Sequence, residues 1–102
     1  MMAAYEFDGL KFDWDDDKYK INVEKHGIYF EEAASAFVDD NAVILPDDAH
    51  SYREERFMLI GFSRSNKLLT VCHCERQNGE VTRIISARRA EHIEIILYNR
   101  GG

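Results

Sequence analysis

The sequence predicts an α+β protein: a small antiparallel sheet with two helices from the first half of the chain on one face, and a further helix at the C-terminus. Two observations predict this class. Apolar residues recur at helical spacing early in the chain and again at its end. Between these stretches lie short apolar segments separated by tight-turn sequences such as Asn78-Gly79. Strands joined by such turns pair antiparallel, so the early helices must bury their apolar stripes on one sheet face.

The first half of the chain is expected to contain a short strand at residues 10–12, followed by two helices. The first helix spans 15–26, because acidic residues at 15–17 complement the positive end of a helix dipole and Gly27 supplies a left-handed stop. The second helix spans 30–39. Its apolar stripe consists of Phe30, Ala33, Ala34 and Phe37.

Two polar residues of the first predicted helix lie on the face that is expected to pack inward. Asn22 and His26 share this face with Tyr19 and Val23 at the i, i+3, i+4, i+7 positions. Burying a polar group without a partner costs roughly 1–3 kcal/mol. A satisfied structural pair of hydrogen-bonding groups is the ordinary explanation, and a functional role is the alternative.

The second half of the chain is expected to form strands and to close with a helix at 89–98. Pro46 ends the first of these strands, and hairpin turns follow at 63–66 and at Asn78-Gly79. The closing helix lies at an edge of the sheet or on its other face. The expected strands are 42–45, 57–62, 68–75 and 81–87.

Composition predicts one cytoplasmic domain covering residues 1–102. The chain is 45% hydrophobic, which suffices for one small core, and no apolar run approaches the ~18 residues of a membrane span. Its N-terminal residues lack the basic and apolar regions of a signal peptide. Cys72 and Cys74 lie two apart on one strand face, a poor geometry for a mutual disulfide, so we expect a reduced protein.

Charge is distributed unevenly along the chain, although the net charge is −6. Residues 1–50 contain thirteen acidic and four basic side chains, a net −9. Residues 51–102 contain six acidic and nine basic side chains, a net +3. Phosphate binding depends on a local basic patch rather than on total charge, so the net charge does not exclude a nucleic-acid partner. The acidic half is suited to a basic partner protein.

The most distinctive basic segment is Arg83-Ile84-Ile85-Ser86-Ala87-Arg88-Arg89. Regular strand alternation places Ile84, Ser86 and Arg88 on one face and the residues between them on the other. Arg88 and Arg89 then fall where the last strand ends and the closing helix begins, a place where free backbone N–H groups suit an anion. Pairing of these arginines with Glu91, Glu55 or the acidic half is the alternative.

A second polar cluster, Glu54-Glu55-Arg56, precedes the strand at 57–62. Alternation puts Arg56 and Arg64 at the two ends of one apolar strip on this strand. Surface salt bridges are the ordinary explanation, and guanidinium groups around a scissile phosphate are the alternative. Cys72, Cys74 and scattered histidines are too few converging ligands for zinc, so no metal or cofactor is expected.

The ordered set of motifs in this chain resembles the BrnT family of type II toxin–antitoxin toxins. The resemblance covers about residues 10–95. It is carried by Trp14, Asp15, Lys18, Asn22, Lys25, His26 and Gly27, by Phe30-Glu31-Glu32-Ala33, by the stretch from Asp47 through His50-Ser51 and Glu54-Glu55-Arg56-Phe57 to Ile60-Gly61, and by Arg83 to Arg88.

This resemblance implies a RelE-like fold and a metal-independent ribonuclease that arrests translation. It also implies a BrnA-like antitoxin, a ribbon-helix-helix DNA-binding protein whose complex with the toxin represses its own operon. The toxin would then contact DNA only indirectly, through the antitoxin.

Cleaving RNA without a metal uses the substrate's own 2′-hydroxyl as nucleophile, and arginine suits stabilisation of the charge on phosphorus. We expect Arg56 and Arg88 to clamp the phosphate, with Arg64 and Arg89 in support. Glu55 or His26 is the expected proton acceptor, and His26 with Lys25 the donor and electrostatic aid. The pattern does not assign acid and base between them.

Two other functions compete with a ribonuclease. A catalytically silent relative would only hold an antitoxin and assist repression, and it would not stop growth when expressed alone. A stand-alone RNA-binding protein would lack a neighbouring gene for a small DNA-binding partner.

Overall fold

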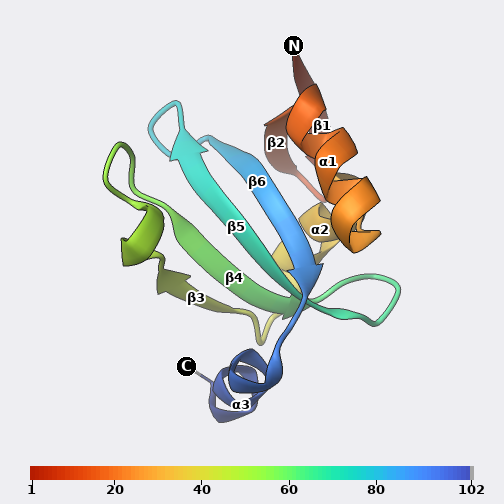
Figure 1. The fold of residues 1–102 in the computed structure, drawn as a ribbon, viewed down its shortest axis with the longest axis vertical. Coiled ribbons are helices and arrows are strands. Elements are labelled where there is room, and N and C mark those ends of the chain that lie inside the picture. The colour runs from red at the N-terminus through yellow and green to blue at the C-terminus, as the bar shows by residue number, and fades with distance from the viewer. Residues whose placement is uncertain (102) are drawn as a thin grey trace.

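The computed structural model describes residues 1–101, and in this range it contains six strands, three α-helices and two short 3₁₀ turns (Figure 1). The strands are β1 (Met2–Phe7), β2 (Leu10–Asp15), β3 (Val43–Pro46), β4 (Phe57–Phe62), β5 (Leu68–Arg76) and β6 (Val81–Arg89). The helical elements are α1 (Asp16–His26), α2 (Phe30–Ser35), η1 (Ala36–Val38), η2 (Asp48–His50) and α3 (His92–Arg100).

All six strands form one sheet in the order β1-β2-β6-β5-β4-β3. Neighbouring strands pair antiparallel except β2 and β6, which run parallel. The α+β class is confirmed, but the expectation of a purely antiparallel sheet is wrong. It failed because β2 pairs with a strand far along the chain, so no turn sequence dictates their relative direction.

Strand β1 was not expected from the sequence. It forms a hairpin with β2 through Asp8 and Gly9, which both have positive φ, 52° and 81°. Asp-Gly is a strong signal for a two-residue hairpin turn, because both central residues of that turn need positive φ. The signal was therefore present, at a position that the prediction left outside the sheet.

The core lies between the sheet and α2. Phe30, Ala33 and Ala34 of α2 are buried against Leu69 and Val71 of β5. Tyr19 of α1 packs against the same cluster, so both early helices contact one core. The predicted second helix ends early, since the chain tightens from α2 into η1 at Ala36. Among the described helices, none is long and apolar enough to cross a membrane.

Helix α1 has the predicted ends, and one of its two inward polar residues is buried. Asp15 caps the N-terminus by accepting a hydrogen bond from the Lys18 amide at 3.1 Å, and Gly27 ends the helix at φ 70°. Asn22 is 3% exposed and fully hydrogen-bonded. His26 is exposed, which contradicts its expected inward position.

Asn22 completes the edge of β6 beyond the point where β2 stops pairing with it. Its side-chain amide donates to the carbonyl groups of Ala87 and Ile28, both at 2.9 Å, and its oxygen accepts from the Ala87 amide at 2.9 Å. The parallel pairing with β2 ends at Arg83. Asn22 therefore satisfies the Ala87 backbone as a neighbouring strand would.

A bulge in β6 changes which of its side chains share a face. Cys72 pairs with Ser86 and His73 with Ile84, so Ile85 has no partner in β5. Ile84 and Ala87 are consequently both in the core, three positions apart. The predicted alternation, with Ile84, Ser86 and Arg88 on one face, is wrong for this reason.

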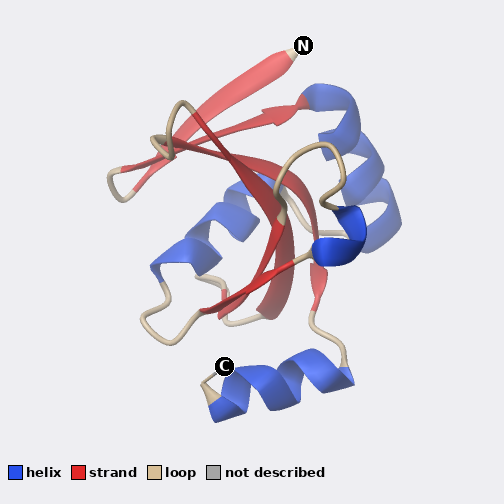
Figure 2. Cartoon of the chain, turned by 90° about the vertical axis from the view of Figure 1, so that its left-hand side faces the viewer, coloured by secondary structure: helices blue, strands red, loops and turns tan. Residues whose placement is uncertain are grey.

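Helix α3 stands at the end of the sheet, apart from the other helices (Figure 2). It begins at His92 rather than at 89, because β6 continues to Arg89 and Glu91 caps the helix. Ile93 and Ile95, at 60% and 41% exposure, face outward, and Glu94 is the buried residue of this helix.

Candidate active site

A hollow of about 330 Å³ opens on the sheet face that α2 does not cover. Leu69 and Val71 of β5 are in the core, so Thr70 and Cys72, which alternate with them along the strand, face the other side. The segment from β3 to β4 forms one wall, and β6 forms the opposite wall. The hollow is lined by Asp47, His50, Arg56, Met58, Thr70, Cys72, Ile85, Ser86 and Arg88.

Two guanidinium groups from distant parts of the sequence line this hollow. Arg56 lies directly before β4 and Arg88 is near the end of β6. In the sheet order β6-β5-β4, β5 lies between them and supplies the floor. Arg88 reaches this face because the bulge at Ile85 leaves Ala87 in the core. The two arginines therefore lie on the same side of the sheet, as the sequence-based hypothesis requires.

Asp47 and His50 form a polar pair at the wall of the hollow. Nδ1 of His50 lies 3.0 and 3.1 Å from the two carboxylate oxygens of Asp47. A carboxylate only accepts hydrogen bonds, so this contact keeps a proton on Nδ1 and leaves Nε2 to exchange protons with a substrate. The His50 side chain is 67% exposed and that of Asp47 is 11% exposed, so the ring is open to solvent above an anchored carboxylate.

Ser51 fixes the loop between this pair and β4. Its hydroxyl donates to the Asp47 carbonyl at 2.6 Å and accepts from the Arg56 amide at 3.0 Å. The Asp47 amide in turn donates to the Arg56 carbonyl at 2.9 Å. These bonds close the loop at its base, so Asp47 and Arg56 keep a fixed spacing.

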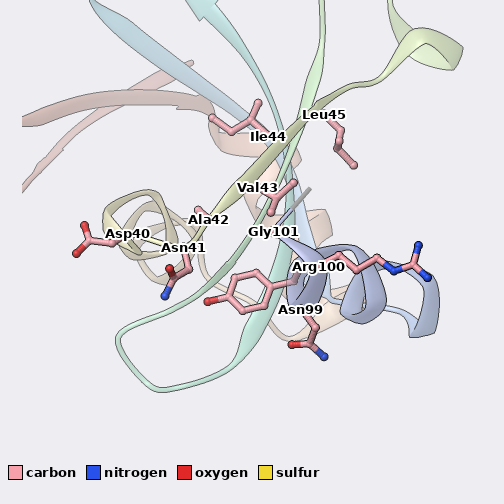
Figure 3. A pocket seen from close by; sticks show the side chains of 10 residues that line it. Asp40, Asn41, Ala42, Val43, Ile44, Leu45, Asn99, Arg100 and Gly101 are labelled. Atoms are coloured by element: carbon pink, nitrogen blue, oxygen red, sulfur yellow. The ribbon is translucent and has the colours of Figure 1, made fainter.

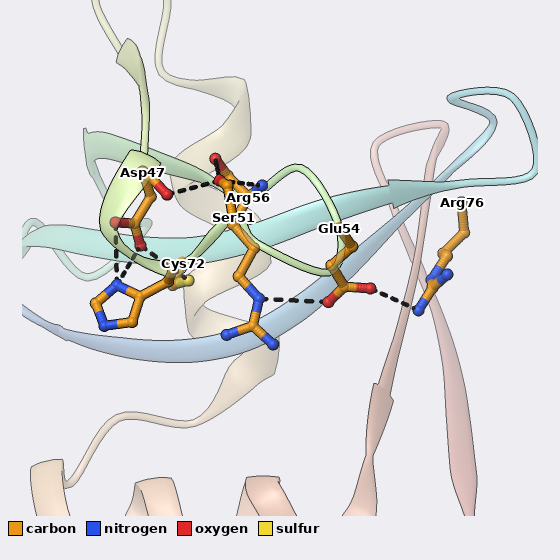
Figure 4. A network of polar contacts seen from close by, with 7 residues as sticks. Asp47, Ser51, Glu54, Arg56, Cys72 and Arg76 are labelled. Carbon is orange, nitrogen blue, oxygen red and sulfur yellow. Dashed lines mark hydrogen bonds and ion pairs between the residues drawn. The ribbon is translucent and has the colours of Figure 1, made fainter.

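Glu54 bridges two arginines outside the hollow. It accepts from Arg56 Nε at 3.3 Å and from Arg76 Nη2 at 3.0 Å, and Figure 4 shows its carboxylate between the two guanidinium groups. The Arg56 side chain remains 28% exposed. Glu54 engages Nε of Arg56, and within residues 1–101 the outer nitrogens remain available for a further acceptor.

Arg88 is held by a carboxylate that the sequence did not single out, Glu94 of α3. Nη1 and Nη2 of Arg88 donate to the two Glu94 oxygens, both at 2.8 Å. These hydrogen bonds lower the pKa of Glu94 to about 2, and they raise that of Arg88. Both groups are therefore fully charged at neutral pH.

Cys72 in the floor of the hollow is not an activated nucleophile. Burial and the nearby Asp47 carboxylate raise its pKa to about 11, so the thiol stays protonated. Both cysteines are free, as expected. His73 faces the core side, where its ring centroid lies 4.9 Å from that of Phe37.

Two arginines that the sequence grouped with the phosphate clamp lie elsewhere. Arg64 leaves β4 in the turn after Phe62, and its guanidinium carbon lies 5.0 Å from the centroid of the Phe7 ring. Arg89 pairs across the ladder with Leu69, a core residue, so it faces the helix-covered side. Neither residue lines the hollow.

The predicted proton-transfer residues also lie outside the hollow. Lys25 and His26 occupy the last turn of α1 with exposed side chains. Figure 1 shows α1 beside β6, on the side of the sheet away from η2, which contains His50. Glu55 is exposed in the loop before β4 and does not line the hollow. The structure brings Arg56 and Arg88 together with Asp47 and His50 instead.

Asp47 and His50 could have been found from their spacing. Asp47-Asp48-Ala49-His50 spans one helical turn, which places residues i and i+3 side by side. The sequence signal for Glu94 is weaker: it is a carboxylate among the isoleucines of the closing helix. Its six-residue separation from Arg88 crosses a strand end, a loop and a helix start, so no regular period relates them.

A larger hollow of about 750 Å³ separates β3 from α3 (Figure 3). Its walls run from Asp40 to Leu45 and from Tyr98 to Gly101. Asp40 and Arg100 are the charged residues of these walls, and no histidine accompanies them. The smaller hollow therefore has the stronger set of groups for acid–base chemistry.

Two comparisons with known proteins show what this chain is similar to. The family described as "Ribonuclease toxin, BrnT, of type II toxin-antitoxin system" matches residues 14–94. The crystal structure of the Brucella abortus ribonuclease toxin BrnT is similar, with a TM-score of 0.59 and 26% sequence identity over 78% of this chain and 94% of that one. Among curated proteins, none matches this sequence.

The fold and this match define a toxin of a type II toxin–antitoxin system, a class in which a toxin is paired with an antitoxin. The family match covers most of the chain, and the structural match shows a similar fold. The chain belongs to the BrnT ribonuclease toxin family.

Proposed function

We propose that this protein is a metal-independent endoribonuclease that cleaves RNA in the hollow between β4 and β6 and thereby inhibits translation. One observation carries the proposal: Arg56 and Arg88 line one hollow together with the His50–Asp47 pair. Guanidinium groups bind phosphate oxygens, and a histidine oriented by a carboxylate moves protons near neutral pH. The family match to ribonuclease toxins supports this assignment.

In this proposal the substrate's 2′-hydroxyl attacks the adjacent phosphorus. The hydroxyl proton leaves to a base, the new O–P bond forms, and the bond to the 5′-oxygen breaks as that oxygen takes up a proton. The products are a 2′,3′-cyclic phosphate and a free 5′-hydroxyl. Nε2 of His50 serves one of the two proton transfers. Arg56 and Arg88 stabilise the charge that develops on the phosphoryl oxygens.

Alanine variants of the hollow test the assignment. Arg88→Ala and His50→Ala should each reduce RNA cleavage at least tenfold without unfolding, since each removes a group on the reacting phosphate. Arg100→Ala is the matched control, because Arg100 lies in the other hollow. Cleavage should persist in EDTA, and a substrate with 2′-deoxyribose at the cleaved position should remain intact. Wild-type cleavage by Arg88→Ala and His50→Ala would refute this site.

The partner in this proposal is a BrnA-like ribbon-helix-helix antitoxin. The toxin would contact DNA only indirectly, through this antitoxin. Membership of a type II toxin family supports an antitoxin partner. The acidic first half of the chain would suit a basic antitoxin segment. Co-expression with the product of the adjacent gene should restore growth and yield a co-purifying complex; no rescue and no complex would exclude this partner.

A silent antitoxin-binding module is the second candidate. It is favoured by the fact that Arg56 and Arg88 each already bind a carboxylate, Glu54 and Glu94. Expression of the toxin alone separates the two functions. An active ribonuclease stops growth and degrades cellular RNA, whereas a silent module leaves both unchanged.

A further inference from the structure

Glu94 is a buried carboxylate that accepts four hydrogen bonds. It is 5% exposed. Its oxygens accept from Arg88 Nη1 and Nη2 at 2.8 Å, from Thr70 Oγ1 at 2.8 Å and from the Glu91 amide at 2.7 Å. These donors come from β5, β6 and the start of α3. A carboxylate fixed on three elements has little freedom to move, so it holds its guanidinium partner equally firmly.

The pairing with Glu94 uses only one edge of the Arg88 guanidinium. Nη1 donates to Glu94 and to the Arg89 carbonyl, the latter at 3.3 Å, and Nη2 gives one hydrogen bond to Glu94. Within residues 1–101, Nε of Arg88 has no hydrogen-bond partner. A guanidinium carries five N–H donors, so the Nε–Nη2 edge retains two. Arg88 is also one of the residues that line the hollow.

The rest of α3 contributes little to the core. Glu94 is its buried residue, and the flanking Ile93 and Ile95 are exposed. At its other end, Tyr98 donates to an Asp39 oxygen at 2.8 Å and packs edge-on against Phe62. Among the described residues, Glu94 and Tyr98 therefore provide polar contacts between α3 and the rest of the fold, and the contact at Glu94 is the one made with a residue of the hollow.

We infer that Glu94 is a positioning residue: it fixes Arg88 so that the free Nε–Nη2 edge binds a phosphate group of the RNA. This inference rests on the proposed function. Side-on binding through Nε and Nη2 is a bidentate geometry that matches two phosphate oxygens. Without Glu94, Arg88 would sample other rotamers and lose orientation before binding.

RNA binding measured apart from cleavage tests this role. The probe is a short single-stranded RNA with 2′-O-methyl groups throughout, which binds but lacks the nucleophile, and its dissociation constant is followed over a series of salt concentrations. Glu94→Gln should weaken binding about tenfold, close to the effect of Arg88→Ala, as expected for a charge-assisted hydrogen bond. Each variant should lower the slope of log K against log salt by about 0.7, the value for one phosphate contact.

The double variant isolates the coupling between the two residues. If Glu94 acts through Arg88, Glu94→Gln combined with Arg88→Ala should bind no more weakly than Arg88→Ala alone. Additive losses would show that Glu94 does not act through Arg88, and tighter binding by Glu94→Gln would show that it competes with phosphate. Either result overturns the inference.

Tyr98→Phe is the matched control, because it removes the other polar contact of α3 and leaves Arg88 untouched. We expect unchanged RNA binding for this variant. Thr70→Val is the milder test if Glu94→Gln unfolds, since it removes one donor to Glu94 and should weaken binding in the same direction. Unchanged binding by folded Thr70→Val together with Glu94→Gln would refute the positioning role. A wild-type protein that neither binds the probe nor cleaves RNA would refute the proposed function itself.

Discussion

The side chain of Asn22 is the most informative single contact of the fold to remove. It makes three hydrogen bonds with backbone groups, all at 2.9 Å, and joins α1 to the edge of β6. Truncation in Asn22→Ala leaves the carbonyl groups of Ile28 and Ala87 and the Ala87 amide without partners. At about 1 kcal/mol for each bond, the free energy of unfolding should fall by about 3 kcal/mol. For a domain of this size that corresponds to a Tm lowered by about 12–24 °C.

Chemical denaturation followed by circular dichroism measures this loss, and Lys20→Ala on the exposed side of α1 is the control. Hydrogen exchange adds a local measurement, because the Ala87 amide should lose protection in Asn22→Ala beyond the loss in global stability. A change below about 1 kcal/mol, with the Ala87 amide still protected, would refute the claim that Asn22 closes the edge of β6.

Three further perturbations address other parts of the fold. The folded-state pKa of Glu94, about 2, lies below its ordinary value of 4.5, so its stabilisation is complete above pH 5 and is lost as the pH falls toward 2. Acid titration of unfolding should accordingly be shallower for Glu94→Gln, and an identical profile would contradict the ion pair. Gly61→Ala should destabilise by about 1–3 kcal/mol, because the new Cβ would lie 2.9 Å from the Ala36 carbonyl oxygen; a neutral effect in thermal melts would show that η1 yields. Cys72, with its pKa raised to about 11, should resist iodoacetamide at pH 8 until the protein unfolds, and rapid native labelling would show a more open hollow.

Elements with strong local signals could be predicted from the sequence, and those set by distant partners could not. Helix α1 begins and ends where Asp15 and Gly27 indicated, and β4 has its predicted bounds. The parallel pairing of β2 with β6 joins segments about seventy residues apart, which no local pattern encodes. The bulge at Ile85 could not be predicted from the sequence either, because the apolar side chain of Ile85 is compatible with either face of the sheet.

The candidate site was also only partly predictable from the sequence. Arg56 and Arg88 were predicted to meet, and they do line one hollow. Arg64 was predicted to support the phosphate clamp because strand alternation was extended past Phe62. The strand ends at Phe62, and the chain turns there, so the alternation does not reach Arg64. Asp47 and His50 lie in a loop that is closed by Ser51. A loop has no regular spacing of apolar residues, so sequence periodicity does not indicate which of its side chains face the hollow.

The extra residue in β6 also determines where positive charge gathers on the molecule. Arg83 and Arg88 are five positions apart, an odd number that would send them to opposite sides of an unbroken strand. The bulge restores them to one side, where Arg83 binds Asp13 and Arg88 binds Glu94. Deleting Ile85 would leave the two arginines four positions apart, an even number, so an unbroken strand would still hold both on this side. The bulge thus accommodates one extra residue in β6 without moving either arginine to the helix-covered face.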